Sequence, residues 1–177
     1  KLTLFMEWLL ANRIQVGLLI GLALVAGAAV YKNKVEVVEK EEKAAEDLLA
    51  AISPIFQVDG IDEGQPMSVL LSKVRQDHPE TRAANNAQFL LASALFDAGK
   101  FTEAAAAFHV YIGLANGGPL ATAAQFGLAA SQDAVGKTDK ARKGYEAVIS
   151  QHGTSNEALQ ARVALAKILL AKPNPDV

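Results

Sequence analysis

The sequence repeats itself at a fixed spacing of 37 residues. A Leu-Ala pair begins at Leu91, Leu128 and Leu165, and a Gly-Lys pair begins at Gly99 and Gly136. Gly99 separates two alanine-rich stretches, and small residues in quantity suit closely packed helices better than strands. A repeat of this length is typical of stacked helical hairpins, in which each hairpin buries its apolar face on its neighbours. The sequence therefore predicts an all-α fold built from such hairpins.

Several repeat positions have a definite physical role. Gly99 and Gly136 can adopt the left-handed conformation that ends the first helix of a hairpin. Alanines let two helices approach closely, and an aromatic residue can fill the wedge between successive hairpins. The alanines are Ala92, Ala104, Ala129 and Ala141, and the aromatic residues are Phe108 and Tyr145. We expect a first helix over residues 79–98, a second from Phe101, and a last helix opened by a capping box of Thr154 and Glu157.

An uncharged apolar run covers Ile14–Tyr31, in which Gln15 is the one strongly polar residue. As a helix it would be about 27 Å long, close to the roughly 30 Å hydrocarbon core of a bilayer. The run is longer than the roughly 7–15 residues usual in a cleaved signal peptide. A buried core helix is disfavoured because the run is apolar on every face. The sequence therefore predicts a transmembrane helix over residues 14–32.

Small residues lie on one face of this predicted span, at Gly17, Gly21 and Ala28. They would allow close packing against another membrane helix. The alternative is that glycine and alanine are simply common in such helices. Residues 1–13 have an amphipathic pattern that suits a segment lying in the membrane interface. Because the chain begins at Lys1, we also expect residues upstream of it.

The remaining segments complete the predicted organisation. Residues 33–56 form a charged helical stalk with near-heptad spacing of apolar residues, or alternatively the first helix of the following domain. Residues 57–78 hold a loop and a short helix with Pro66 near its first position. The repeats occupy residues 79–172, and residues 173–177 form a tail.

Catalytic and cofactor chemistry is not indicated. The absence of cysteine excludes disulfides, thiolate metal sites and cysteine nucleophiles. The three histidines, His78, His109 and His152, lack the helical spacing of a metal pair. The sequence contains no glycine-rich phosphate loop, and its net charge of -2 offers no basic field for nucleic acid. We therefore expect no enzyme activity, no metal, no cofactor and no nucleic-acid partner.

The hairpins over residues 79–172 resemble the tetratricopeptide repeat. Together with the phrase FMEWLLANRIQVGLLIGLALVAGAAVYKNK, the layout resembles the YfgM-like ancillary subunits of the bacterial SecYEG translocon. The resemblance implies a single-pass inner-membrane protein whose repeats lie in the periplasm and act as an adaptor or chaperone-like factor. It implies a translocase and folding factors as partners. The lysines after residue 31 favour the opposite orientation. The alternative function is a structural accessory subunit of another membrane complex.

The resemblance also places a partner-binding groove on the first helix of each hairpin. The groove positions are Phe89, Ser93, Phe96, Phe126, Ala130 and Asp133. These residue types lack the lysine and asparagine that grip a C-terminal carboxylate in some family members. The groove is therefore predicted to be apolar and to suit an extended or helical hydrophobic segment. The alternative is that the phenylalanines belong to the core or are covered by the helix over residues 66–77.

Overall fold

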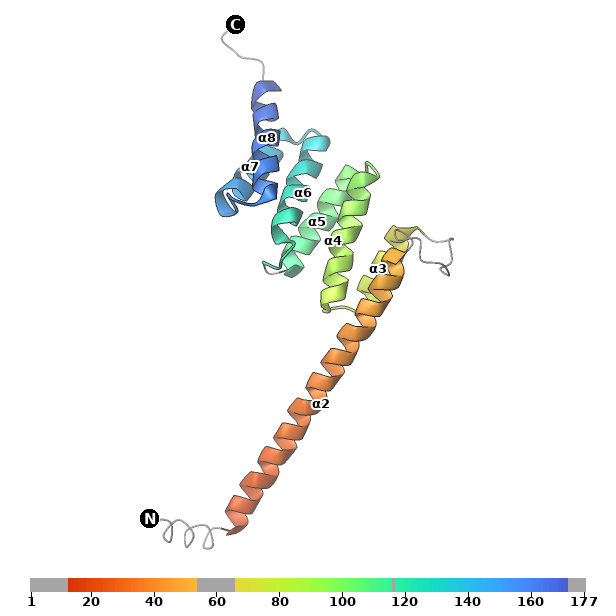
Figure 1. The fold of residues 1–177 in the computed structure, drawn as a ribbon, viewed down its shortest axis with the longest axis vertical. Helices are drawn as coiled ribbons and strands as arrows, with labels where there is room; N and C mark the ends of the chain where they lie inside the picture. The colour runs from red at the N-terminus through yellow and green to blue at the C-terminus, as the bar shows by residue number, and fades with distance from the viewer. Residues whose placement is uncertain (1–12, 54–65, 116, 172–177) are drawn as a thin grey trace, which may run out of the picture. The chain divides into compact units, whose positions relative to one another are not determined.

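The structure, a computed structural model, describes residues 13–53, 66–115 and 117–171. Within these ranges every regular element is helical, as the sequence predicts (Figure 1). The helices are α2 (Arg13–Ile52), α3 (Met67–Asp77), α4 (Arg82–Asp97), α5 (Phe101–Ala115), α6 (Ala121–Ala134), α7 (Thr138–Gln151) and α8 (Asn156–Ala171). The predicted interfacial segment, apart from residue 13, and the predicted tail lie outside the described residues.

The chain divides into two units, residues 1–42 and 43–177. In the first unit, α2 exposes each side chain that the structure describes between Ile14 and Glu42, except the half-buried Glu41. Lys32 and Glu36 form an ion pair of 3.8 Å on this surface, one helical turn apart. An exposed pair of this kind adds only about 0.3–0.5 kcal/mol to a helix.

Membrane crossing was predicted for residues 14–32. Among the residues that the structure describes, no helix combines the length and the apolar character that a membrane span needs. The structure therefore does not support the predicted transmembrane helix.

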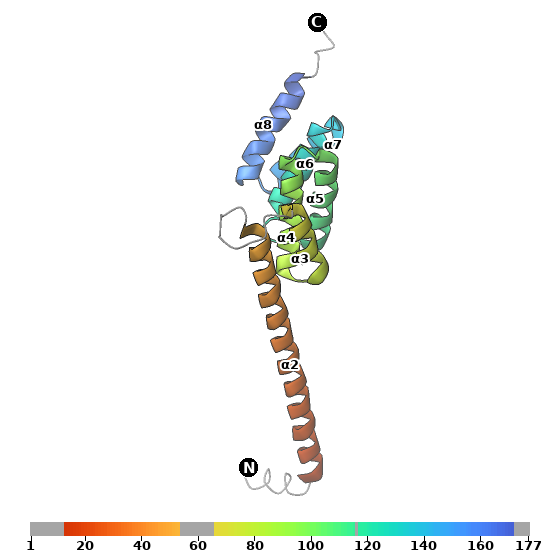
Figure 2. The ribbon, with the colours of Figure 1, turned by 90° about the vertical axis from the view of Figure 1, so that its right-hand side faces the viewer.

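The second unit is a stack of antiparallel hairpins. Each helix from α3 to α8 contacts the next one in the chain, and α6 also contacts α4 and α8. The two views agree that the helices follow one another in chain order (Figures 1 and 2). The first helices of successive hairpins, α4, α6 and α8, therefore form one row, against which α5 and α7 pack.

The repeat predicted from the sequence is present in the core. Three clusters of buried residues follow one another along the stack, and Leu91, Leu128 and Leu165 each pack at the edge of a different cluster. In each case the cluster contains residues of the two helices that come before the helix of the leucine. Phe108 and Tyr145 are almost completely buried between hairpins, at 4% and 2% exposure. The 37-residue spacing therefore corresponds to equivalent positions in space.

The two predicted glycine turns have the expected backbone conformation. Gly99 has a φ of 74° and Gly136 a φ of 77°, both in the left-handed region. The Lys100 N–H donates to the Leu95 carbonyl at 2.9 Å, and the Lys137 N–H donates to the Gln132 carbonyl at 2.8 Å. These bonds satisfy carbonyl groups at the ends of α4 and α6, which otherwise would lack partners.

Helix starts differ in detail from the prediction. α4 begins at Arg82, where the Thr81 hydroxyl accepts a 3.0 Å hydrogen bond from the Ala84 N–H. α8 is capped by Ser155, whose hydroxyl accepts a 3.1 Å bond from the Ala158 N–H, and not by the predicted Thr154. Pro66 is the N-cap of α3 and not its first residue. A cap depends on which hydroxyl meets a free N–H, and neighbouring hydroxyl residues are hard to tell apart by spacing.

The last turns of α2 belong to the second unit. Ala44 and Ala51 are buried, and Ala51 shares a cluster with Leu71 and Val74 of α3. The Asp47 carboxylate lies 2.6 Å from Nε2 of His78, at the end of α3. The alternative interpretation of residues 33–56, as a first domain helix, therefore fits the part from residue 43 to residue 52.

Candidate protein-binding surface

The phenylalanines of the predicted groove pack against the second helix of their own hairpin. The Phe89 ring lies edge-on to Phe108 and Tyr111 of α5, with centroid distances of 5.9 and 5.5 Å. Phe126 contacts Tyr145 of α7 at 5.7 Å. Phe89 and Phe126 are both half-buried. Aromatic contacts of this geometry stabilise a core by about 0.5–1.5 kcal/mol beyond the area they bury.

The other predicted groove residues lie in different surroundings. Phe96 contacts Phe101 across the α4–α5 turn, with ring centroids 5.1 Å apart. The Ser93 hydroxyl donates to the Phe89 carbonyl at 3.1 Å, and Ala130 is half-buried. The structure thus brings Phe89 and Phe96 to the edge of one core cluster, while Phe126 lies at the edge of another. Their role in binding a partner stays a prediction.

The predicted membrane-packing residues lie on α2. Gly21 and Ala28 are exposed, and a Cβ atom added at Gly21 would meet no atom within 4 Å. The side-chain surroundings of Gly17 lie outside the described part of the chain. Packing of this face on another helix stays a prediction.

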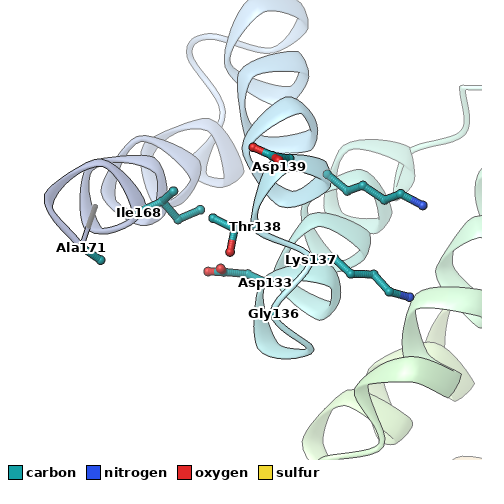
Figure 3. Close-up of a pocket in the computed structure, with 8 residues that line it drawn as sticks. Asp133, Gly136, Lys137, Thr138, Asp139, Ile168 and Ala171 are labelled. Atoms are coloured by element: carbon teal, nitrogen blue, oxygen red, sulfur yellow. The ribbon is translucent and has the colours of Figure 1, made fainter. Parts of the chain in front are cut away.

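Asp133, the last predicted groove residue, lines a pocket of about 650 Å³ between the α6–α7 turn and the end of α8. Figure 3 shows Asp133 and Thr138 on the side of Ile168 and Ala171, whereas Lys137 points away from them. The pocket is open to solvent along this edge, and its lining includes two carboxylates, two lysines, one hydroxyl and an apolar wall. This combination carries no recognisable catalytic arrangement.

Burial changes the acidity of two tyrosines. Removal from water, together with the negative charge of Asp133, raises the pKa of Tyr145 to about 12. Burial also raises the pKa of Tyr111, an effect that its hydrogen bond with the Leu120 backbone partly offsets. Both phenols are therefore held in their neutral form inside the stack.

One buried glutamine joins three helices. The Gln88 amide of α4 donates to the Ala107 carbonyl of α5 at 2.8 Å, and Arg75 of α3 donates to the Gln88 oxygen at 2.6 Å. Gln125 is its equivalent in the next hairpin, and its Oε1 is buried without a hydrogen-bond partner among the described residues. The position of Arg75 is taken there by Ile112, which has no group to donate. The hydrogen bonds of Gln88 are therefore not repeated at the equivalent Gln125.

An apolar stripe on α8 was not predicted from the sequence. It consists of Leu159, Val163, Ala166 and Leu170, all exposed, with Leu159 at 55%, Val163 at 57% and Leu170 at 86%. These residues are spaced by four, three and four positions, so they lie on one face of the helix. The opposite face of α8, with Ala158, Ala161 and Ile168, is buried in the stack.

The repeat explains why this stripe is apolar. Ala166 is equivalent to Ala129 and Ala92, which are both completely buried. Val163 is equivalent to Phe126 and Phe89, which pack on α7 and α5. The stripe on α8 is thus equivalent to the face of α4 that α5 covers and to the face of α6 that α7 covers. The sequence contained a signal for this, because it predicts two whole hairpins followed by a single helix.

Metal-binding groupings are not found in the described ranges. In residues 13–53, 66–115 and 117–171, no three histidine or acidic side chains cluster as metal ligands would. His109 is exposed, and His78 is engaged with Asp47.

The family model of the tetratricopeptide repeat-like domain matches residues 7–143 of the chain. The chain belongs to this family. The tetratricopeptide repeat-like match begins before α2 and ends within α7, so α8 lies beyond it. Domains of this kind are typically non-catalytic modules for protein–protein interaction, and no enzyme family is indicated. A comparison with curated proteins gives no match.

Proposed function

We propose that this tetratricopeptide repeat-like protein is a non-catalytic adaptor that holds protein partners beside a membrane. The repeat unit would provide the binding surface, and the apolar run of α2 would attach it to the lipid. One observation carries the attachment: the described side chains from Ile14 to Tyr31 are all exposed on α2, and the run contains no charge. Exposed apolar side chains on all sides of a helix are favourable only when another apolar phase covers them.

The proposed location is the bacterial inner membrane, with the repeat unit in the periplasm. The support is the resemblance of the N-terminal region to YfgM-like subunits. The partners would then be a translocase and soluble folding factors. A reporter test decides the side: alkaline phosphatase fused after Val177 should be active in intact cells, and an inactive fusion would place the repeats in the cytoplasm.

A second candidate is a structural accessory subunit of another membrane complex. It is favoured by the contacts of Phe89 and Phe126, whose rings pack inside their own hairpins. A surface already filled by its own aromatic rings suits one fixed neighbour better than many different clients.

Membrane attachment is tested by changing the run itself. Replacing Leu18, Leu22 and Val25 by lysine should release the protein from membranes at alkaline pH, whereas the unchanged chain should stay in the pellet. Val35, Val37 and Val38 supply the matched control, because they are exposed on the same helix but beyond the run. Their replacement by lysine should leave the protein in the pellet. Equal behaviour of the two variants would argue against attachment through this run.

Partner binding is tested on the row of first helices. Ser93→Lys and Ala130→Lys place a long charged side chain at two predicted groove positions without removing an aromatic core contact. We expect them to lose the partners recovered by pull-down in mild detergent. His109→Lys on α5 is the control, because His109 is exposed and belongs to the other row. Recovery of one fixed neighbour favours the structural subunit, and recovery of many unrelated chains favours the chaperone-like adaptor.

A further inference from the structure

The stripe of Leu159, Val163, Ala166 and Leu170 lies exposed along one face of α8. On α4 and α6 the equivalent face is covered by an antiparallel helix. α8 contacts α7 and α6 through its opposite face, and no described helix covers its stripe. Because the equivalent faces of α4 and α6 are each covered by an antiparallel helix, one more antiparallel helix would fit this stripe.

We propose that the covering helix is α8 of a second copy of this chain, packed antiparallel in a two-fold dimer. In such a dimer each contact occurs twice. If one residue of the first copy faces a second residue of the other copy, then the second residue of the first copy also faces the first residue of the other copy. The stripe meets this condition. The pairs Leu159 with Leu170 and Val163 with Ala166 are both centred between Ala164 and Leu165. An antiparallel partner centred there therefore brings all four stripe residues of each copy into contact.

Side-chain size also fits this arrangement. Val163 of each copy would face Ala166 of the other, so a larger residue meets a smaller one at both central contacts. The repeat uses small residues at the same position: a Cβ added at Gly144 would lie 2.8 Å from the Cβ of Ala129. Because Ala129 is equivalent to Ala166, a helix can approach this face of α8 closely.

Charge selects the antiparallel arrangement over the parallel one. Arg162 and Lys167 flank the stripe on opposite sides and are five residues apart, and both are exposed. In a parallel pair these flanking positions face each other, which would place arginine against lysine twice. In the antiparallel pair, the same side of the stripe meets on the two copies: the side with Arg162 faces the side with Arg162, and the side with Lys167 faces the side with Lys167. Arg162 then faces Leu169, and Lys167 faces Gln160, so no like charges are opposed.

The size of the contact sets its strength. α8 has 16 residues and is about 24 Å long. Two helices of this length bury less than the roughly 1,200–2,000 Å² that stable interfaces bury in total. We therefore expect a weak, concentration-dependent dimer. The inference uses only residues of α8 and does not depend on membrane attachment or on the proposed partners.

Cysteine crosslinking of the full chain in mild detergent tests the dimer, because the native chain has no cysteine. A mixture of Leu159→Cys and Leu170→Cys chains should form a disulfide between copies, since these positions face each other. Each variant alone should not, because its two cysteines would be about 16 Å apart along the helix axis. Val110→Cys on α5, also exposed, is the control for random collision. An unchanged thermal melt shows that the variants are folded.

Two outcomes would overturn the proposal. Crosslinking of Leu159→Cys alone would indicate a parallel pair. A mixture that crosslinks no faster than Val110→Cys would indicate that α8 is covered by a helix of another protein, or by none. A second measurement uses sedimentation: the native chain should gain mass with concentration, and Val163→Glu should raise the dimer dissociation constant at least tenfold. Val110→Glu should leave it unchanged, and equal effects of the two variants would contradict the assigned interface.

Discussion

Among the glycines that the structure describes, Gly127 is the one where an added Cβ atom would have the least room. A Cβ atom at this position would lie 2.5 Å from the ring of Phe108, which is itself buried. Gly127→Ala therefore forces α6 away from α5, and we expect a loss of about 1–3 kcal/mol in the free energy of unfolding. Urea denaturation of the two chains measures this loss.

Gly113 is the matched control for this substitution. It lies within α5, and a Cβ there would meet no atom within 4 Å. Gly113→Ala should leave stability unchanged or raise it by up to about 1 kcal/mol, because alanine favours the helix more than glycine. If Gly113→Ala destabilised the protein as much as Gly127→Ala, the close contact with Phe108 would not be the cause.

Gln88 and Gln125 occupy equivalent positions but should differ in how much they contribute to the stability of the fold. Gln88→Leu leaves the Ala107 carbonyl and the Arg75 guanidinium without their buried partner, so we expect a loss of about 1–3 kcal/mol. Gln125→Leu removes a buried oxygen that has no described partner, so stability should change little or rise. Thermal melts of the two variants give the comparison, and equal losses would argue against this hydrogen-bonding difference.

Tyr145 should make the repeat unit sensitive to alkaline pH. Its folded pKa is about 12, above the ordinary value of 10.0, so the folded state keeps a proton that the unfolded state releases. The contribution to stability is complete below pH 10 and is lost as the pH rises toward 12, at about 1.4 kcal/mol per pKa unit. Tyr145→Phe should weaken this pH dependence. A residual slope from Tyr111 is expected, because its pKa is raised too.

At the scale of the helices, two neighbouring hydroxyl residues at the start of α8 should differ in their contribution to stability. The Ser155 hydroxyl accepts the Ala158 N–H, so Ser155→Ala should cost about 0.5–2 kcal/mol. Thr154→Ala should cost little, because Thr154 is exposed and is not the residue that caps Ala158. Chemical denaturation separates the two cases, and a larger loss for Thr154→Ala would restore the capping box predicted from the sequence.

For the molecule as a whole, the boundary of the repeat unit within α2 has a measurable consequence. A chain that begins at Lys43 keeps Ala51 against Leu71 and Val74, and it should melt at the same temperature as the repeat unit of the full chain. A chain that begins at Pro66 exposes these apolar side chains and should lose about 2–4 kcal/mol. Calorimetry makes the comparison. Equal melting of the two truncated chains would mean that α2 adds nothing to the core.

Much of the repeat unit could be predicted from the sequence because its information is local. The glycines at 99 and 136 have the left-handed conformation expected of them, and Phe108 and Tyr145 fill the space between hairpins. A helix-turn-helix unit is specified by residues close together in the chain, and its copies then stack in the same way. The family match agrees with this prediction.

The sequence by itself thus determined that the chain is helical and repeated. Only the tertiary structure decided which helix covers which face. It placed the Phe89 and Phe126 rings against the second helix of each hairpin and left the equivalent face of α8 open. The physical reason is that apolar spacing marks a face as one to be covered but does not specify its neighbour. That neighbour depends on contacts between residues far apart in the chain.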